Sequence, residues 1–281
     1  MRRQPASKEI VRTLRIGWLG AVLVGLAFGA AAFAQDSASE SAAAEQELFR
    51  RINRDRAEAD LPDLEWNEWL AKAARKHAAE MARRGQLSHQ FPGEPGLRDR
   101  IAATSLRFNA SGENVATAPT PAEMHDDWMH SPGHRANILE PKYNSIGVAV
   151  VRSGNELYAV TDFAHSVPAL SASDLEDAVA AAINQVRSQK KLPPLAYRRD
   201  PELRRYACEM ARNNRVNATA LLGRSNASAS LAFTETDPAN LGSHLRTVAN
   251  AVTSKTFLVG ACFARNSTYP EGTNWVVVAF Y

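Results

Sequence analysis

Residues 128–139 read Trp-Met-His-Ser-Pro-Gly-His-Arg-Ala-Asn-Ile-Leu, and the rest of the chain is organised around them. The Ser-Pro-Gly sequence within this stretch is typical of a turn. Because Gly133 has no Cβ, the backbone there can approach a neighbouring group closely while the imidazole of His134 points at it. The preceding segment begins at Thr120-Pro121, and a threonine cap followed by proline predicts the start of a helix. The stretch therefore predicts a helix that ends in a turn presenting His134.

Two further motifs precede this stretch, namely Ser88-His89 and Gly112-Glu113-Asn114, and the second is predicted to follow a loop, with Ser111-Gly112 as a turn. Together with the Ser-Pro-Gly-His sequence, and in this order, they resemble the CAP superfamily of cysteine-rich secretory, antigen-5 and pathogenesis-related type-1 proteins. The resemblance is to the bacterial branch that lacks the eukaryotic cysteines, and it covers residues 45–165. It implies an α+β fold, specifically a three-layer α-β-α sandwich.

The resemblance also implies a large cleft that holds two histidines and two glutamates. The histidines match His89 and His134, and one glutamate matches Glu113. Ser131 stands where the second glutamate is expected, which leaves a triad. The family's candidate ligands are lipids, sterols, and cell-wall or peptide material. The residues expected to line the cleft are His89, Glu113, Asn114, Ser131 and His134.

Two histidines and a glutamate with an open fourth position form a zinc-type ligand set. We therefore consider His89, His134 and Glu113 as ligands for zinc or another divalent cation. The alternative is a buried hydrogen-bonded cluster in which Glu113 orients an imidazole and no cofactor is bound. Because the three residues are far apart in the sequence, their spacing does not decide between these interpretations.

A hydrolase is the alternative from another functional class. Ser88, Ser111 and Ser131 each lie beside a motif residue, so a Ser-His-Glu arrangement can be drawn. Serines also cap turns, and this is the simpler explanation for all three. Loss of the second carboxylate removes the natural general base for a metal-bound water. We expect ligand binding rather than metal-dependent or serine-type hydrolysis.

The remaining histidines of this region have simpler interpretations. His77 lies on the apolar face of a helix predicted from Asn67 to Gly85, and we expect it to be a satisfied core residue. His125 and His130 flank two aspartates, but an offset of five does not put them on one helix face. We interpret both as solvated surface residues.

The N-terminus has the three regions of an export signal. Five basic residues precede residue 16, residues 16–31 are almost wholly apolar, and Ala32-Phe33-Ala34 is a small-x-small cleavage site. We expect removal of residues 1–34 and a secreted or periplasmic protein with no membrane span. An uncleaved anchor is the alternative, because the apolar run approaches spanning length. Residues 35–44 are rich in Ser, Ala and Glu and are predicted to be a disordered lead-in.

The charge balance argues against a nucleic-acid partner. The whole chain of 281 residues has 33 Lys and Arg against 30 Asp and Glu, a formal net charge of +3. Residues 1–34 contain five of the basic residues and one acidic residue, which leaves 28 against 29, or −1. The basic excess therefore belongs to the predicted signal and does not indicate nucleic-acid binding.

After a linker-like segment at 166–173, residues 174–281 repeat the pattern of the first half. Ile-Asn-x-x-Arg at residues 52–56 returns at 183–187, and Leu-Pro-x-Leu at 61–64 returns at 192–195. A recurrence of this kind predicts a duplication. After residue 171 there is no Gly-Glu-Asn and no Ser-Pro-Gly-His, and the only histidine of the second half is His244, in Leu-Gly-Ser-His-Leu. We expect a degenerate copy kept for packing or partner binding, as in a structural envelope protein, with an unrelated α+β domain as the alternative.

Both cysteines, Cys208 and Cys262, lie in this second half, one on a predicted helix and one on a predicted strand. In an oxidising compartment they can form a disulfide. Two buried free thiols are the alternative.

Overall fold

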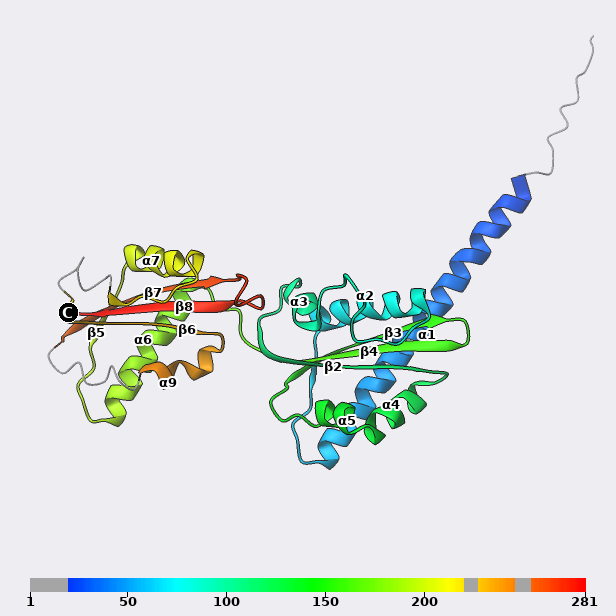
Figure 1. Cartoon of the computed structure of the whole chain (residues 1–281), viewed down its shortest axis with the longest axis horizontal. Coiled ribbons are helices and arrows are strands. Elements are labelled where there is room, and N and C mark those ends of the chain that lie inside the picture. Colours follow the sequence, from blue (N-terminus) through cyan, green and yellow to red (C-terminus); the bar gives the residue numbers. More distant parts are fainter. Residues whose placement is uncertain (1–19, 220–226, 246–253) are drawn as a thin grey trace, which may run out of the picture.

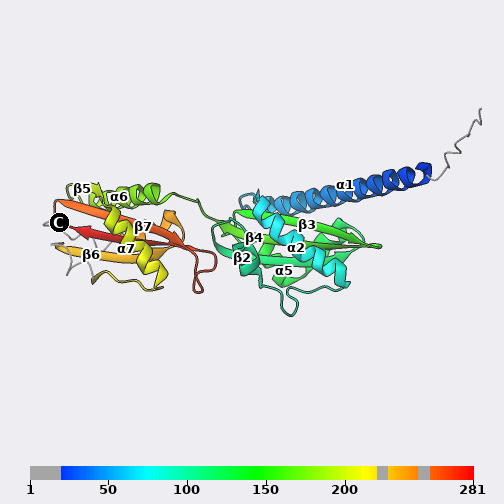
Figure 2. The same ribbon diagram turned by 90° about the horizontal axis from the view of Figure 1, so that it is seen from above.

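The computed structural model describes residues 20–219, 227–245 and 254–281, which form two four-stranded sheets with their flanking helices (Figures 1 and 2). In the first half the strand order is β1-β3-β4-β2. The β1–β3 pair is parallel, and β3, β4 and β2 are antiparallel to one another. The elements of this half are α1 (Gly20–Glu58), β1 (Glu65–Trp66), α2 (Glu68–Arg84), α3 (Leu97–Ala102), β2 (Phe108–Ala118), α4 (Pro121–His130), α5 (Pro132–Ile138), β3 (Ser145–Ser153) and β4 (Glu156–Ser166).

The first sheet lies between two helical layers, with α2 and α3 on one face and α1, α4 and α5 on the other (Figure 1). Because side chains alternate along a strand, neighbouring residues of β3 belong to different cores. Val148 packs with Leu48 of α1 and Trp128 of α4, whereas Ala149 packs with Ala78 of α2. This arrangement is the three-layer α-β-α sandwich that the sequence predicts.

Gly147 of β3 lets α2 lie directly on the sheet. A Cβ at this position would lie 2.0 Å from the backbone nitrogen of Ala71, a distance that no packed atom pair can adopt. Because Gly147 has no side chain, α2 can approach β3 this closely.

Local signals in the sequence predict several boundaries correctly. Asn67 caps α2 by accepting from the amides of Trp69 and Leu70, and Thr120 caps α4 by accepting from the amide of Glu123. These contacts satisfy amides that have no partner within the helix. Strands β3 and β4 are joined as an antiparallel hairpin around Gly154.

Three local predictions are wrong. Residues 35–44 are helical and continue α1, with Glu40 paired to Arg152 and Ala44 buried, because the sheet provides a surface for this end of the helix. Gly112-Glu113-Asn114 lies within strand β2 instead of a loop. His134 lies in the first turn of α5 instead of an open turn, since Ser131 is the extended residue before that helix.

The second half contains a sheet of order β5-β7-β8-β6, with α6 on one face and α7 on the other (Figures 1 and 2). Its β5–β7 pair is parallel and its other pairs are antiparallel, as in the first sheet. Its elements are α6 (Ala172–Gln189), β5 (Ala196–Arg199), α7 (Pro201–Arg212), β6 (Ala229–Glu235), η1 (Pro238–Asn240), α9 (Leu241–Leu245), β7 (Thr256–Ala264) and β8 (Thr273–Phe280).

Cys208 of α7 and Cys262 of β7 form a disulfide, with their Cα atoms 5.1 Å apart. The sequence left a disulfide and two buried free thiols as alternatives, and the structure contains the disulfide. It joins the outer helix of the second half to a central strand of its sheet.

The predicted export signal falls largely outside the part of the chain that the structure describes, which begins at residue 20. Within the described ranges, no helix combines the length and the apolar character needed to cross a membrane.

Candidate functional site

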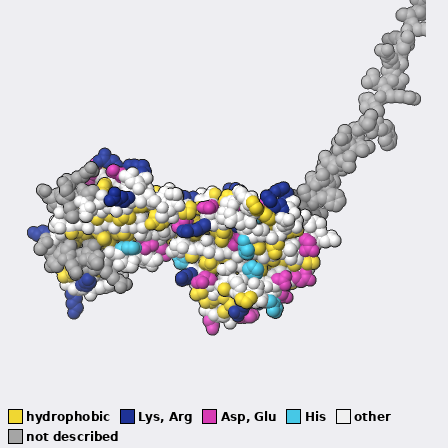
Figure 3. All heavy atoms as spheres, viewed as in Figure 1, with side chains coloured by type: hydrophobic (Ala, Val, Ile, Leu, Met, Phe, Trp, Pro, Cys, Tyr) yellow, Lys and Arg dark blue, Asp and Glu magenta, His cyan; other side chains and the backbone are white. Residues whose placement is uncertain are grey.

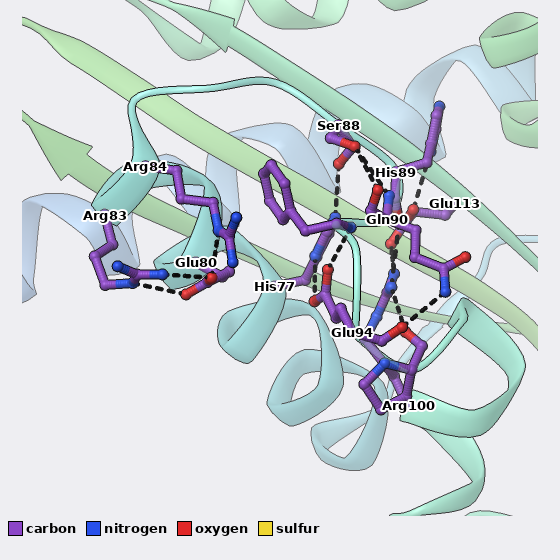
Figure 4. Close-up of polar contacts among 12 residues, drawn as sticks. His77, Glu80, Arg83, Arg84, Ser88, His89, Gln90, Glu94, Arg100 and Glu113 are labelled. Carbon is purple, nitrogen blue, oxygen red and sulfur yellow. Dashed lines mark hydrogen bonds and ion pairs between the residues drawn. The ribbon is translucent and has the colours of Figure 1, made fainter.

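Strand β2 places Glu113 at the centre of the site. Its side chain is buried, with 4% of its surface exposed, and its two oxygens have different partners. Oε1 accepts from Nδ1 of His89 at 2.9 Å, and Oε2 forms an ion pair with the guanidinium of Arg100 in α3 (Figure 4). One carboxylate therefore joins a strand, a loop and a helix.

His89 lies in the loop between α2 and α3, and this loop is held by a second histidine. The buried ring of His77 contacts Glu94 through Nδ1 at 2.7 Å and the carbonyl oxygen of Ser88 through Nε2 at 2.8 Å (Figure 4). Glu94 also accepts from the amide of Phe91 at 3.1 Å. His77 is thus the satisfied core residue that the sequence predicts, and it fixes the loop that presents His89.

Helix α5 brings His134 to the same place. The His134 and His89 rings lie 6.1 Å apart between centroids. Asn114 of β2 donates to the backbone oxygen of His134 at 3.0 Å, and Asn137 donates to the side-chain oxygen of Asn114 at 2.9 Å. The structure therefore brings together His89, Glu113 and His134, which are far apart in the sequence.

Two of the residues expected in the cleft have other surroundings. Asn114 is fully buried and holds α5 against β2, so it does not face a ligand. Ser131 is half-buried at the start of α5, and its side chain does not cap the helix. The His89 side chain is 58% exposed and His134 is half-buried, so both residues are accessible at the surface. Figure 3 shows histidine side chains gathered on this half of the molecule among hydrophobic ones.

The family model of the cysteine-rich secretory protein family, CAP, matches residues 49–163. This range contains β2, the His89 loop and α5, which carry the site. Residues 49–163 are a CAP domain.

The chain is also similar to several individual proteins. The uncharacterized protein YkwD of Bacillus subtilis is 34% identical over 118 residues, which is 42% of this chain and 46% of the relative. The chain thus matches less than half the length of that protein. An extracellular SCP-domain protein of Bacillus anthracis is 27% identical, with a TM-score of 0.41, over 44% of this chain and 41% of the other. An outer surface protein of Borrelia burgdorferi is 21% identical, with a TM-score of 0.42, over 44% of this chain and 92% of the other.

The two imidazoles of the CAP domain differ in their affinity for protons. The hydrogen bond with Glu113 raises the pKa of His89 above its usual value, and partial burial opposes this effect. Burial lowers the pKa of His134, and the neighbouring His89 lowers it further. As the pH falls, His89 is therefore the first of the pair to become charged.

A second buried carboxylate lies beside Glu113 in the sheet. Asp162 of β4 is directly opposite Glu113 of β2 and is fully buried, and among the described residues neither of its oxygens has a hydrogen-bond partner. Burial raises the pKa of Asp162 well above its usual value, and the charge of Glu113 raises it further. The two carboxyls therefore differ in their surroundings, because Glu113 forms an ion pair with Arg100 whereas burial disfavours a charge on Asp162.

Sequence reasoning missed Arg100 and Asp162. Arg100 follows Arg98 in a short charged helix, and no pattern distinguishes one arginine from the other. Asp162 offered a signal, because it interrupts the apolar run of strand β4. A charged residue inside an apolar strand is costly unless a partner or a proton compensates it.

The predicted three-ligand metal site does not fit this arrangement. Both oxygens of Glu113 are engaged, one by His89 and one by Arg100, so the carboxylate is not available as a third ligand. Among the described residues, no group of three or more His, Cys, Asp or Glu side chains could hold a metal ion. The hydrogen-bonded cluster, which the sequence left as an alternative, describes this site.

The serine and histidine candidates around the site have structural roles or none. The hydroxyl of Ser88 donates to the carbonyl oxygen of Gln90 at 2.8 Å, so it caps a turn, as the simpler interpretation predicts. No side-chain contact of Ser111 or Ser131 with either imidazole occurs within the described ranges.

The interpretation of His125 as a surface residue is wrong, whereas His130 is exposed as predicted. His125 is buried between α4 and α1, where its Nε2 contacts Oδ2 of Asp55 at 2.6 Å. Its partner is 70 residues away in the sequence, so local patterns contain no signal for this pair.

Proposed function

We propose that the protein is exported and that its CAP domain binds a ligand carrying an acidic group at the surface formed by His89 and His134. The observation that carries this proposal is the pairing of an exposed imidazole with a buried carboxylate. Glu113 accepts from Nδ1 of the exposed His89 ring, so in the imidazolium form Nε2 is a second donor that Glu113 does not use. An imidazole oriented in this way is a strong hydrogen-bond donor to an anion.

The charges of the site support an anionic ligand over a neutral one. Glu113 favours the imidazolium form of His89, while Arg100 neutralises the carboxylate beneath it. His134 is the less basic ring and offers a neutral donor or acceptor beside it. Of the candidate ligand classes, peptides of the cell wall carry carboxylates, whereas sterols do not. We therefore favour cell-wall or peptide material.

A pair of matched peptides tests the proposal. The probe is a labelled muramyl peptide with a free C-terminal carboxylate, and the reference is the same peptide as its amide. We expect the carboxylate form to bind more tightly, and to bind more tightly at about pH 6 than at about pH 8, because His89 is charged at the lower pH.

The substitution His89→Ala should weaken binding by about tenfold or more, the value of one charge-assisted hydrogen bond. The control is His130→Ala, because His130 is exposed and, among the described residues, its ring bonds only the backbone oxygen of Asp126 in its own helix. Equal binding of the two peptides, or unchanged binding by the His89 variant, would refute the proposal.

Export is supported by the order of basic, apolar and small residues at the N-terminus. The disulfide between Cys208 and Cys262 also favours an oxidising compartment outside the cytoplasm. N-terminal sequencing of the mature protein should give Gln35 as the first residue. A mature chain that starts at Met1 would contradict cleavage.

We also infer that residues 174–281 are a second copy of the same unit. Asn53 binds both the amide and the carbonyl of Leu64, and Asn184 does the same with Leu195. Other matched contacts are Arg56 to Pro62 and Arg187 to Pro193, and the close helix approaches at Gly147 and Gly260. Chance similarity of propensities does not reproduce such a set of equivalent contacts.

An experimental structure of the second half with a strand order other than β5-β7-β8-β6 would contradict the duplication. The copy lacks the imidazole pair, because His244 is its only histidine. We therefore place ligand binding in the first half alone.

A further inference from the structure

The turn between β7 and β8 in the second half reaches α3 of the CAP domain (Figures 1 and 2). Arg265 in this turn donates to three backbone oxygens of the first half. Nη1 contacts the oxygens of Ala102 at 2.5 Å and Thr104 at 2.8 Å, and Nη2 contacts that of Leu106 at 2.9 Å. One guanidinium therefore binds the end of α3 and the loop that leads into β2.

The oxygen of Ala102, the last residue of α3, needs a partner from outside the helix. The last carbonyls of an α-helix have no amide to bind within it. Helix α3 has only six residues and is too short to be stable without tertiary contacts. Arg265 thus supplies the charged C-terminal partner that a helix end favours.

Two more contacts fix the same segment. Arg98 of α3 forms an ion pair with the buried carboxylate of Glu271, which follows Arg265 in the same turn. Beyond the helix, the guanidinium of Arg107 lies 3.7 Å from the ring centroid of Phe263 in β7. The second half therefore holds residues 98–107 at the helix, at the loop and at the strand entry.

The held segment also carries Arg100, the partner of Glu113. Arg100 is buried and donates to the carbonyl oxygens of His89 and Pro95, both at 3.2 Å, in addition to its ion pair with Glu113. Arg98 and Arg100 are two residues apart, so they project from different sides of the helix. One side of α3 thus contacts the second half, and the other contacts the site.

We propose that the second half serves as a clamp on α3 and thereby positions Arg100, Glu113 and His89. In this view the copy without motifs is retained because it supports the site of the first copy. Arg265 is the main positioning residue, although it touches none of the site side chains. The proposal is independent of the ligand, because it concerns the conformation of the unliganded protein.

Hydrogen exchange of the full chain, measured by mass spectrometry, tests the clamp. The variant Arg265→Ala removes the three contacts, and Arg265→Lys keeps the charge but replaces the two guanidinium nitrogens that reach the three oxygens by a single ammonium nitrogen. The control is Arg205→Ala, because Arg205 is exposed on α7 of the same half and, within the described ranges, forms its ion pair with Glu202 alone. We expect amides of residues 97–107 to exchange about tenfold faster or more in both Arg265 variants, with α2 and the control unchanged.

The ring signal of His89 in NMR spectra provides a readout at the site. It should shift in both Arg265 variants and stay in place in the Arg205 variant. Peptides from β7 and β8 show whether the second half remains folded, and Arg98→Ala provides a second way to release α3 if Arg265→Ala unfolds that half. The clamp would be overturned if the amides of residues 97–107 exchange at the same rate in Arg265→Ala, Arg265→Lys and Arg98→Ala as in the unmodified protein. If these amides exchange faster but the His89 signal does not shift, the link between the clamp and the site would be overturned.

Discussion

The ion pair of Arg100 and Glu113 should be a large local contribution to the stability of the CAP domain. Both side chains are almost completely buried, with 6% and 4% of their surface exposed. Removing one partner of a buried pair leaves an uncompensated charge and costs about 3–5 kcal/mol. We expect Glu113→Gln to lower the free energy of unfolding by about 3 kcal/mol, the low end of this range, because two carbonyl oxygens still bind Arg100.

The variant Arg100→Met should cost a similar amount, because it leaves Glu113 buried beside Asp162. The double variant should then cost less than the sum of the two by about 2 kcal/mol, since neither charge remains alone. The control pair is Arg205 and Glu202, which are exposed and should couple by less than about 1 kcal/mol.

The assay is hydrogen exchange of β2 and β4 peptides at increasing urea concentration, which reports on the first sheet separately from the second. If the free-energy cost of the double variant equals the sum of the two single variants to within about 0.5 kcal/mol, Arg100 and Glu113 do not interact, and the reasoning about the site fails.

Three further predictions concern single features of the fold. The raised pKa of His89 means that the folded state binds its proton more tightly than the unfolded state, so this stabilisation is complete below about pH 6.5 and is lost as the pH rises through the folded pKa. Unfolding measured over a series of pH values should show this loss of stability. If the same loss also occurs in His89→Gln, His89 is not its cause. Replacing Cys208 and Cys262 by serine should destabilise the second sheet by about 4 kcal/mol, for a closed loop with a sequence separation of 54, and leave exchange in the first sheet unchanged. Gly147→Ala should destabilise the first sheet by about 3 kcal/mol, because the new Cβ would lie 2.0 Å from the α2 backbone, whereas Gly133→Ala, with open space around it, should be nearly neutral in the same denaturation assay.

The sequence by itself determines the features that depend on near neighbours. The caps at Asn67 and Thr120 and the β3–β4 hairpin are set by residues within a few positions of each other. The three motifs identify the CAP domain, because their residues and their order along the chain can be recognised without knowledge of tertiary contacts. The placement of His77 on an apolar helix face also predicts its burial.

Only the tertiary structure decides the chemistry of the site. The sequence around Glu113 reads as a loop, and its pairing with β4 makes it a strand, because backbone pairing across a sheet overrides local preference. The same pairing puts Asp162 beside Glu113, and the packing of α3 brings Arg100 to the carboxylate. The ion pair with Arg100 determines that Glu113 orients His89 instead of serving as a metal ligand. The predicted set of His and Glu residues does not contain this information.

The contacts between the two halves are also decided by the tertiary structure and not by local sequence. Arg265 and the oxygens that it binds are about 160 residues apart, as the separations of 163, 161 and 159 show. Sequence patterns report on spacing along one helix or strand, whereas burial, charge pairing and proton affinity depend on groups brought together in space. For this reason the fold could be predicted from the sequence, and the properties of its charged residues could not.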